Sequence, residues 1–206
     1  FTTQAQGYDI EINENANITT QTTFINTGSL TLGDATDDVL TFNTGLVATA
    51  PSSVTTAGTI ATSEDVLTIG AALTLAADTT LDTDSNNDNT GAAINLNSTV
   101  NSAANAKSDL NIDNGNGLVT IAGVVGGAAN GGLGAIVIDG GGALDINAAI
   151  TSATSLAQTG TTALGANVTT SGAQTYTGLV TADVAAKRTL TGSTVTFTAG
   201  FNGGAQ

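Results

Sequence analysis

The feature of the sequence that most constrains its fold is a short apolar–polar–apolar triplet that recurs along most of the chain. Two apolar side chains on either side of a polar one give the period-two alternation of a half-buried β-strand. Clusters of Gly, Asn and Asp separate the triplets and predict turns, and no apolar face with helical spacing is sustained anywhere. The sequence therefore predicts an all-β fold. The triplets are Leu30-Thr31-Leu32, Leu40-Thr41-Phe42, Leu67-Thr68-Ile69, Leu73-Thr74-Leu75, Ile94-Asn95-Leu96, Leu110-Asn111-Ile112, Val119-Thr120-Ile121, Leu144-Asp145-Ile146 and Val195-Thr196-Phe197, together with Ile136-Val137-Ile138, whose middle residue is also apolar.

The spacing of the triplets predicts how the strands are arranged. Asp38-Val39-Leu40-Thr41 recurs as Asp65-Val66-Leu67-Thr68, a shift of 27 residues. A period of roughly 20–30 residues with two or three short strands in each period is typical of a solenoid. We therefore predict a right-handed parallel β-helix, with residues 1–206 as one β-solenoid domain. The alternative is an antiparallel β-sandwich, in which hairpins recur every ~8–12 residues. The last apolar residues of the related units lie at steps of 27, 27, 25 and 25 and are Phe42, Ile69, Leu96, Ile121 and Ile146, followed less regularly by Leu164, Tyr176 and Phe197.

The composition agrees with a thin, layered core. Hydrophobic residues make up 40% of the chain but aromatic residues only 3%, so Val, Ile, Leu and Ala have to fill the interior. At ~4.8 Å per coil and roughly 20–27 residues per coil, the chain would make about eight to ten coils, a rod of about 40–50 Å. Residues 82–90 and 126–134 are predicted to project as loops, and Pro51 to lie in a turn.

The charge excludes several classes of partner. The chain has 17 acidic and 3 basic residues and a formal net charge of −14. Nucleic-acid binding requires a basic surface, which Lys107, Lys187 and Arg188 cannot provide, and an anionic membrane surface is disfavoured for the same reason. No apolar run approaches the ~20 residues of a membrane-spanning helix, so we expect no membrane insertion.

The charge is also unevenly distributed along the chain. Residues 146–206 contain one acid, Asp183, and two bases, a net charge of +1, whereas the first 145 residues hold 16 acids and one Lys, a net charge of −15. One interpretation is drift in composition between repeats. The other is that an acidic end and a near-neutral end stack head to tail without repulsion between like charges.

The composition favours an extracellular location. Lysine is scarce, Thr, Gly and Asn are abundant, and the chain is acidic, which suits an exposed, protease-resistant surface protein. Because there is no cysteine, disulfide use gives no information on the compartment. The chain begins at Phe1 and has no apolar segment of the signal-peptide type, so we expect a mature product or an excised piece of a longer protein.

A segment near the C-terminus resembles a known family. Residues 170–178, with the sequence TSGAQTYTG, are followed by RTLTGSTVTF at residues 188–197. This pair of motifs resembles the repeat units of filamentous-haemagglutinin-type surface exoproteins, the large β-helical adhesins of bacteria, in which a GAQTYTG turn leads into TLTGSTVTF. The resemblance implies a right-handed parallel β-helix on a cell surface, and it implies no catalytic residues.

The residue types leave little room for enzymatic chemistry. The absence of His and Cys excludes Ser-His-Asp and Cys-His catalysis and the usual zinc sites. A β-helical polysaccharide hydrolase or lyase would need facing carboxylates, and a 27-residue coil would stack the pairs 37–38 and 64–65. Adjacent residues of one strand point to opposite faces, however, so neither pair supplies a facing acid and nucleophile. We expect the protein not to be an enzyme.

One stretch is a candidate calcium site. Asp82, Asp84, Asn86 and Asp88 alternate and offer oxygen ligands, as the opening of an EF-hand loop does. Position 6 of such a loop would be Asn87 instead of Gly, and position 12 would be Ala instead of Glu. We expect a flexible acidic loop here, with a weak calcium site at these four residues as the alternative, and no other cofactor.

These observations predict a structural role. A solenoid exposes unpaired strand edges at both ends, which have to be capped or paired. Residues 8–12 alternate cleanly, so residues 1–25 form either the first coil or an N-terminal cap or donated strand. We expect a non-catalytic extracellular protein that self-associates as a head-to-tail homopolymer, either a filament subunit or an adhesin stalk on a microbial surface. The alternatives are an adhesin module that binds surface glycans and a polysaccharide-degrading enzyme.

Overall fold

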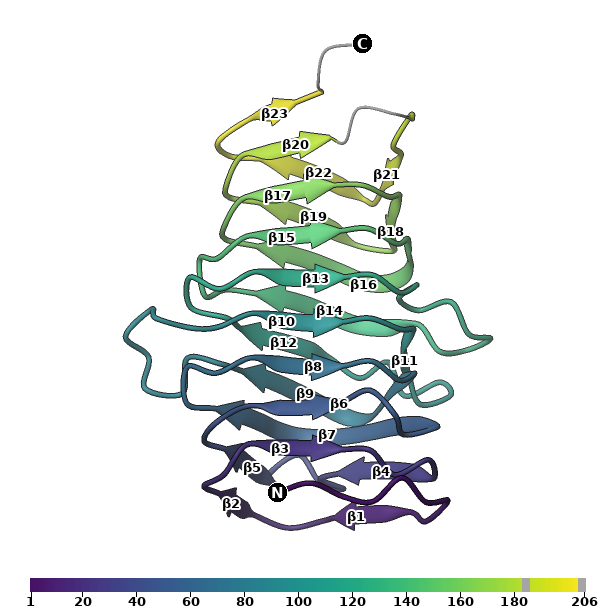
Figure 1. Cartoon of the computed structure of the whole chain (residues 1–206). Coiled ribbons are helices and arrows are strands. Elements are labelled where there is room, and N and C mark those ends of the chain that lie inside the picture. Colours follow the sequence, from purple (N-terminus) through teal and green to yellow (C-terminus); the bar gives the residue numbers. More distant parts are fainter. Residues whose placement is uncertain (183–185, 204–206) are drawn as a thin grey trace.

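The computed structural model describes residues 1–182 and 186–203, and these residues form strands and loops without any helix. Parallel strands stack into a β-solenoid of about 9 turns (Figure 1). As the chain climbs from its N-terminal end in Figure 1, the strands of the near sheet run to the right and those of the far sheet to the left, which is a right-handed coil. The predicted parallel β-helix is confirmed. The antiparallel sandwich is wrong, because the ladders between the described strands are parallel.

Each coil after the first begins with a short strand in the nine-stranded sheet, which we call the front ladder. Its strands are three residues long or shorter, because turns follow each apolar–polar–apolar triplet directly. They are β3 (Thr22–Phe24), β6 (Leu46–Ala48), β8 (Leu67–Ile69), β10 (Ile94–Leu96), β13 (Val119–Ile121), β15 (Leu144–Ile146), β17 (Thr162–Leu164), β20 (Val180–Ala182) and β23 (Phe201–Asn202).

The rest of each coil belongs to the 14-stranded sheet, which bends into two arms. Three strands run through the bend, namely β7 (Ser53–Thr62), β9 (Leu73–Asp82) and β16 (Ile150–Gln158). The first arm also contains β1 (Ile10–Ile12), β4 (Ser29–Leu32), β11 (Val100–Ser102), β18 (Val168–Thr170) and β21 (Leu190–Thr191). The second arm also contains β2 (Ala16–Ile18), β5 (Val39–Phe42), β12 (Leu110–Asp113), β14 (Leu133–Ile138), β19 (Ala173–Tyr176) and β22 (Thr194–Phe197).

The core is a set of columns of apolar side chains that run along the axis of the rod. In the front ladder, Leu67, Ile94, Val119 and Leu144 are successive register partners and are all buried. The polar residue in the middle of each triplet points outward, as the period-two alternation requires. Each fully buried aliphatic side chain contributes about 1.5–3 kcal/mol of transfer free energy, so the stack of columns stabilises the fold without aromatic bulk.

The predicted period is confirmed in the middle of the chain. Ile69, Leu96, Ile121 and Ile146 are register partners in the front ladder, which matches the predicted steps of 27, 25 and 25. Leu164 continues this column after a shorter coil of 18 residues.

The first predicted step of 27 residues is wrong. Phe42 lies in the second arm and pairs with Thr62, whereas Ile69 lies in the front ladder and pairs with Ala48. The repeated tetrapeptides at 38–41 and 65–68 therefore lie on different sides of the rod. All three sides of a coil need the same alternation, so similarity between two triplets does not show that they share a side.

The predicted loops project from the stack. The connection between β9 and β10 extends to one side, and the loops at 103–109 and 126–132 extend to the other (Figure 1). Pro51 lies in the bend between β6 and β7, as predicted. The predicted loop at 126–134 is shorter than expected, because β14 begins at Leu133.

Candidate functional site

The two ends of the rod carry strand edges with a partner on one side only. At the N-terminal end, β1 pairs with β4 and β2 with β5, so residues 10–18 form a first coil inside this chain. At the other end, β21 and β22 pair only with the coil beneath them among the described residues. Unpaired N–H and C=O groups along such edges are templates for further strand pairing.

The same ends expose the apolar core. Inward side chains of the first and last coils pack against the core but are only partly buried, since no described strand stacks on their outer side. Their register partners one coil inward are fully buried, as Leu30 is above Ile10 and Val168 is below Leu190. The partly buried side chains are Ile10, Ile12, Ala16, Ile18, Leu190, Val195 and Phe197.

Aromatic side chains are also confined to the ends. Residues 43–175 contain no aromatic residue. At the N-terminal end, the ring of Phe24 lies 5.9 Å from that of Phe1 and 6.3 Å from that of Phe42, centroid to centroid. At the C-terminal end, the Phe197 ring lies 5.1 Å from that of Phe201, which is 48% exposed. The aromatic rings thus lie within the first and last few coils.

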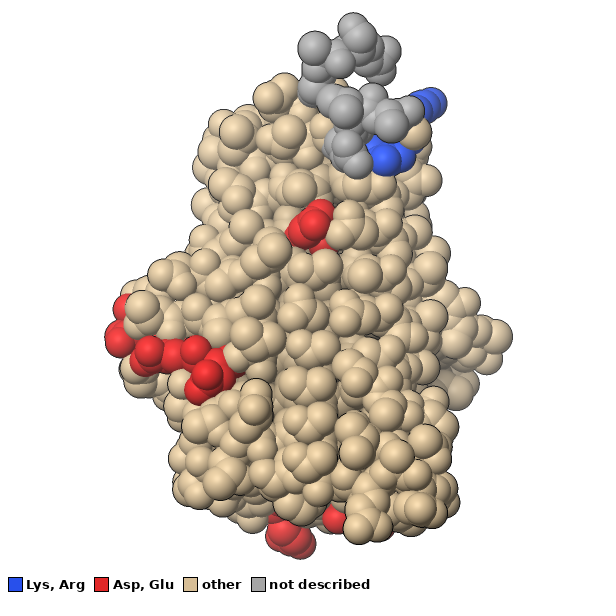
Figure 2. Space-filling model, in the orientation of Figure 1, with Lys and Arg blue, Asp and Glu red and all other residues tan. Residues whose placement is uncertain are grey.

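The two ends differ in charge. Glu11 and Glu14 are exposed in the first coil, and Lys187 and Arg188 come directly before the last first-arm strand, β21. Figure 2 shows acidic residues at the N-terminal end of the rod and basic residues near the C-terminal end. Asp9 also lies in the first coil, where its carboxylate accepts a 2.7 Å hydrogen bond from the Ser29 N–H. That hydrogen bond lowers the pKa of Asp9 and keeps the carboxyl group charged. Asp183, which the sequence places near the two bases, lies outside the described residues.

Asp82 ends β9, and the other three predicted calcium ligands lie in the loop that follows. Their side chains form hydrogen bonds with the loop backbone and with neighbouring residues. The Asp84 carboxylate is buried and accepts hydrogen bonds from the N–H groups of Asp88 (3.1 Å) and Asn89 (2.9 Å). Asp82 accepts from the Asp84 N–H at 2.8 Å, and the Asn86 side chain donates to Glu64 at 2.6 Å. Within the described ranges, no three carboxylates are arranged to hold a metal ion. Calcium binding by this loop stays the untested alternative.

A ladder of carboxylates runs past this loop. Asp113 is the register partner of Asp82, and Asp139 follows at the next coil, where its N–H bonds the Ile112 carbonyl. Burial, together with the negative charges of the neighbouring aspartates, raises the pKa of Asp82 and of Asp113. Sequence reasoning missed this ladder because the three residues are 31 and 26 positions apart, in coils of unequal length.

The adjacent acidic pairs lie on different sides of the rod. Asp38 closes a turn by accepting hydrogen bonds from the N–H groups of Asp34 (2.8 Å) and Ala35 (2.9 Å), which lower its pKa. Its backbone carbonyl binds the Thr59 N–H in the second arm, whereas Asp65 precedes the front ladder. The two pairs are therefore not stacked above one another, and the arrangement expected from a 27-residue coil is wrong.

The comparisons with known proteins add no relative. No described residue belongs to a helix long and apolar enough to cross a membrane. No family model, no curated protein and no solved structure matches the chain.

Proposed function

We propose that this protein is a non-catalytic structural rod on the outside of a microbial cell, and that it self-associates end to end. As a filament subunit it would add a second copy to each end, and as an adhesin stalk it would continue into further coils. The observation that carries the proposal is the pair of open ends, which combine unpaired strand edges with partly buried core residues.

The columns of the core support a continuous joint between two copies. Phe197 is at one end of a column of register partners that begins at Ala16. Leu190 and Ile10 are the two ends of the corresponding column in the first arm. In a joint that keeps this register, the large Phe197 ring would cover the small Ala16 of the next copy, and Leu190 would cover Ile10.

Charge complementarity favours a second copy as the occupant of each end. The acidic Glu11 and Glu14 would approach the basic Lys187 and Arg188 of the next copy. Opposite charges at facing surfaces fix orientation and accelerate association, and they disfavour contacts between like ends. A head-to-head or tail-to-tail contact would bring like charges together. The resulting assembly is therefore polar, with all rods pointing the same way.

Charge reversal tests this proposal. The variant Lys187→Glu/Arg188→Glu has two acidic ends, and the variant Glu11→Lys/Glu14→Lys has two basic ends. In sedimentation velocity at low salt, we expect wild-type protein to form larger species as its concentration rises, and each variant alone to remain a single rod. An equimolar mixture of the two variants should assemble again, because acidic ends then meet basic ends. Wild-type protein that stays monomeric at every concentration, or variants that assemble alone as well as wild type, would contradict the proposal.

A further inference from the structure

Two projecting loops form one rigid wall on the side of the rod. The loop at 103–109 and the loop at 126–132 belong to successive coils and are tied together by backbone hydrogen bonds. The Asn105 N–H donates to the Asn130 carbonyl at 2.8 Å, and the Ser102 N–H donates to the Gly131 carbonyl at 3.0 Å. The Asn101 side chain also accepts from the Ala128 N–H at 2.9 Å. Both loops therefore hold a fixed shape beside the first arm.

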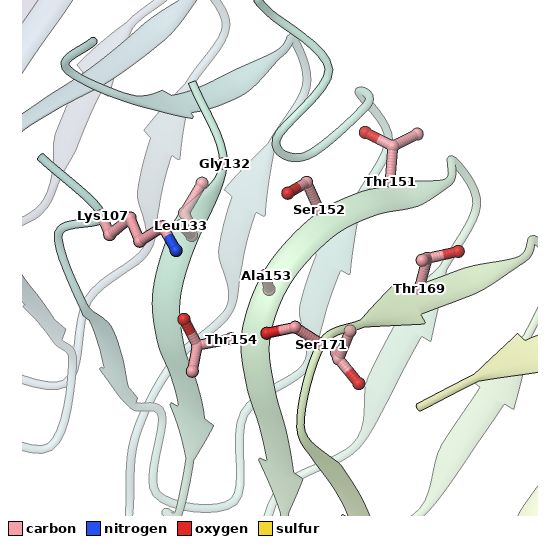
Figure 3. A pocket seen from close by; sticks show the side chains of 10 residues that line it. Lys107, Gly132, Leu133, Thr151, Ser152, Ala153, Thr154, Thr169 and Ser171 are labelled. Atoms are coloured by element: carbon pink, nitrogen blue, oxygen red, sulfur yellow. The ribbon is translucent and has the colours of Figure 1, made fainter. Parts of the chain in front are cut away.

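A groove lies between this wall and the first-arm residues of the next coils. It has two adjoining parts of about 230 and 290 Å³, and Lys107, Gly132 and Ser152 line both of them. The floor of the first part includes Leu133 and Ala153, which are buried. Figure 3 shows the Lys107 side chain from one wall and a row of hydroxyl side chains from the strands opposite.

One side of the groove carries a row of exposed hydroxyl side chains, which we call the hydroxyl row. Ser152, Thr154, Thr169 and Ser171 line the groove, and their hydroxyl groups make no hydrogen bond with any described residue. Ser152 and Thr154 belong to β16, Thr169 belongs to β18, and Ser171 directly follows β18. The two strands are neighbours, since Ala153 of β16 is the register partner of Thr170 of β18. Hydroxyl groups at the ~4.8 Å spacing of adjacent strands can donate to, and accept from, a ligand that itself carries several hydroxyl groups.

Lys107 supplies an unpaired positive charge beside this row. It has a left-handed backbone conformation, with φ 54°, and its ammonium group has no acidic or hydrogen-bonding partner among the described residues. In a chain with 17 acidic residues and 3 basic ones, a lysine left without a carboxylate partner inside a groove is available to an external anion. A carboxylate is the simplest group that one ammonium group can neutralise.

We propose that this groove binds an acidic sugar, a short saccharide that carries one carboxylate. The Lys107 ammonium binds the carboxylate, and the hydroxyl groups of Ser152, Thr154 and Ser171 bind the sugar hydroxyls. The net charge of −14 repels long polyanions, so the ligand is a terminal or isolated acidic residue and not an extended acidic polymer. No aromatic residue lines the groove to stack on a sugar ring, which makes the binding weak.

Titration followed by NMR tests this site, which is independent of the end-to-end contacts. The probes are the methyl glycosides of glucuronic acid and of N-acetylneuraminic acid, with methyl glucoside as the neutral control and sodium acetate as the carboxylate control. We expect saturable shifts for at least one acidic glycoside, confined to residues of the groove, with a dissociation constant in the range of about 1–10 mM. The variant Lys107→Gln should weaken this binding about tenfold, to the level of methyl glucoside. The control variant Asp37→Asn, which also removes one exposed charge but lies outside the groove, should leave the binding unchanged.

Three results would overturn the assignment. One is the absence of shifts with both acidic glycosides up to about 50 mM, which is well above millimolar affinity. Another is binding that Lys107→Gln leaves intact. The third is acetate that binds as tightly as the acidic glycosides, because the hydroxyl row would then contribute nothing. The variant Gly132→Ala adds support if it blocks binding while the protein stays folded, since its methyl group would meet the Ser152 hydroxyl inside the groove.

Discussion

The ring of Phe197 stacks on the ring of Tyr176, with centroids 5.4 Å apart and planes inclined by 17°. The two residues are register partners in adjacent coils, β22 and β19. Tyr176 is fully buried, and burial raises the pKa of its hydroxyl group, whereas Phe197 is only partly buried. Tyr176 is therefore buried because Phe197 of the next coil covers it. A further coil stacked on β22 would bury the Phe197 ring in the same way.

This relationship predicts unequal costs for two substitutions in one column. Tyr176→Ala should lower the free energy of unfolding by about 3–5 kcal/mol, because it leaves a cavity in the core. Phe197→Ala should cost the isolated rod only about 1–2 kcal/mol, mostly from the lost stacking. Urea unfolding at low protein concentration measures both values. Equal costs would mean that the last coil is already covered.

The bend of β7 predicts a site where glycine is required. Gly58 has φ 71°, and a Cβ atom there would meet the carbonyl oxygens of Asp38 and, at 2.7 Å, Ala35. Gly141 also has a positive φ, 85°, but a Cβ atom there meets nothing within 4 Å. Gly141→Ala should therefore cost only the backbone strain, about 1 kcal/mol, and Gly58→Ala clearly more. Thermal unfolding of the two variants compares them directly, and equal losses would show that the bend tolerates a side chain.

The carboxylate ladder predicts that replacing one of its aspartates by asparagine raises the free energy of unfolding, and that this gain depends on pH. The pKa of Asp113 is raised above 3.8 by burial, so its charged form destabilises the fold at neutral pH, and protonation removes this effect as the pH falls through the raised value. Asp113→Asn should raise the free energy of unfolding at pH 7 by about 0.2–1 kcal/mol, the range for like charges facing each other across strands. The gain should vanish below pH 3.8, where the carboxyl group is neutral in both states.

Asp37→Asn is the matched control for this ladder, because Asp37 is exposed. It should change stability little at either pH. Asp9 and Asp38 act in the opposite direction, since their pKa values are lowered and their contribution is lost as the pH falls below 3.8. Denaturant unfolding at a series of pH values separates the two effects, and a loss of stability in Asp113→Asn at pH 7 would contradict the ladder's role.

The loop after β9 predicts a structural role for Asp84 that calcium can test. Asp84→Ala removes the acceptor of two backbone N–H groups and should cost about 1–2 kcal/mol, whereas Asp88→Ala, at an exposed position, should cost less. With these hydrogen bonds already made, we expect 5 mM CaCl2, roughly the Kd range of weak extracellular sites, to change the unfolding temperature little. A saturable rise in that temperature, abolished by Asp88→Ala, would show instead that the loop binds calcium.

The sequence predicted where the strands lie in the chain better than it predicted which side of the coil each strand occupies. Leu67-Thr68-Ile69 and its partners show which side chains point inward, because the alternation has a period of two whatever the neighbours are. Phe42 was assigned to the wrong column because every side of a coil needs that same alternation. The calcium candidate was visible because its residues alternate in sequence. The groove at Lys107 was not, since it joins loops and strands from successive coils whose lengths vary.

End-to-end continuation of the coils is most directly tested by disulfide trapping, since the chain has no cysteine of its own. Asn17 and Thr198 are exposed and lie at the two ends of one outward-facing column. In a joint that keeps the register, their Cα atoms in neighbouring copies would be ~4.8 Å apart, within the range of a disulfide. Thr41 lies one coil deeper in the same column, at about twice that distance and out of reach.

The measurement is the ladder of species on a non-reducing gel after mild oxidation. Asn17→Cys/Thr198→Cys should give dimers, trimers and longer chains that a reducing agent returns to monomer, whereas Thr41→Cys/Thr198→Cys should remain monomeric. Monomer alone from the first variant, or equal cross-linking in both, would contradict a joint in which one copy supplies the next coil of the other.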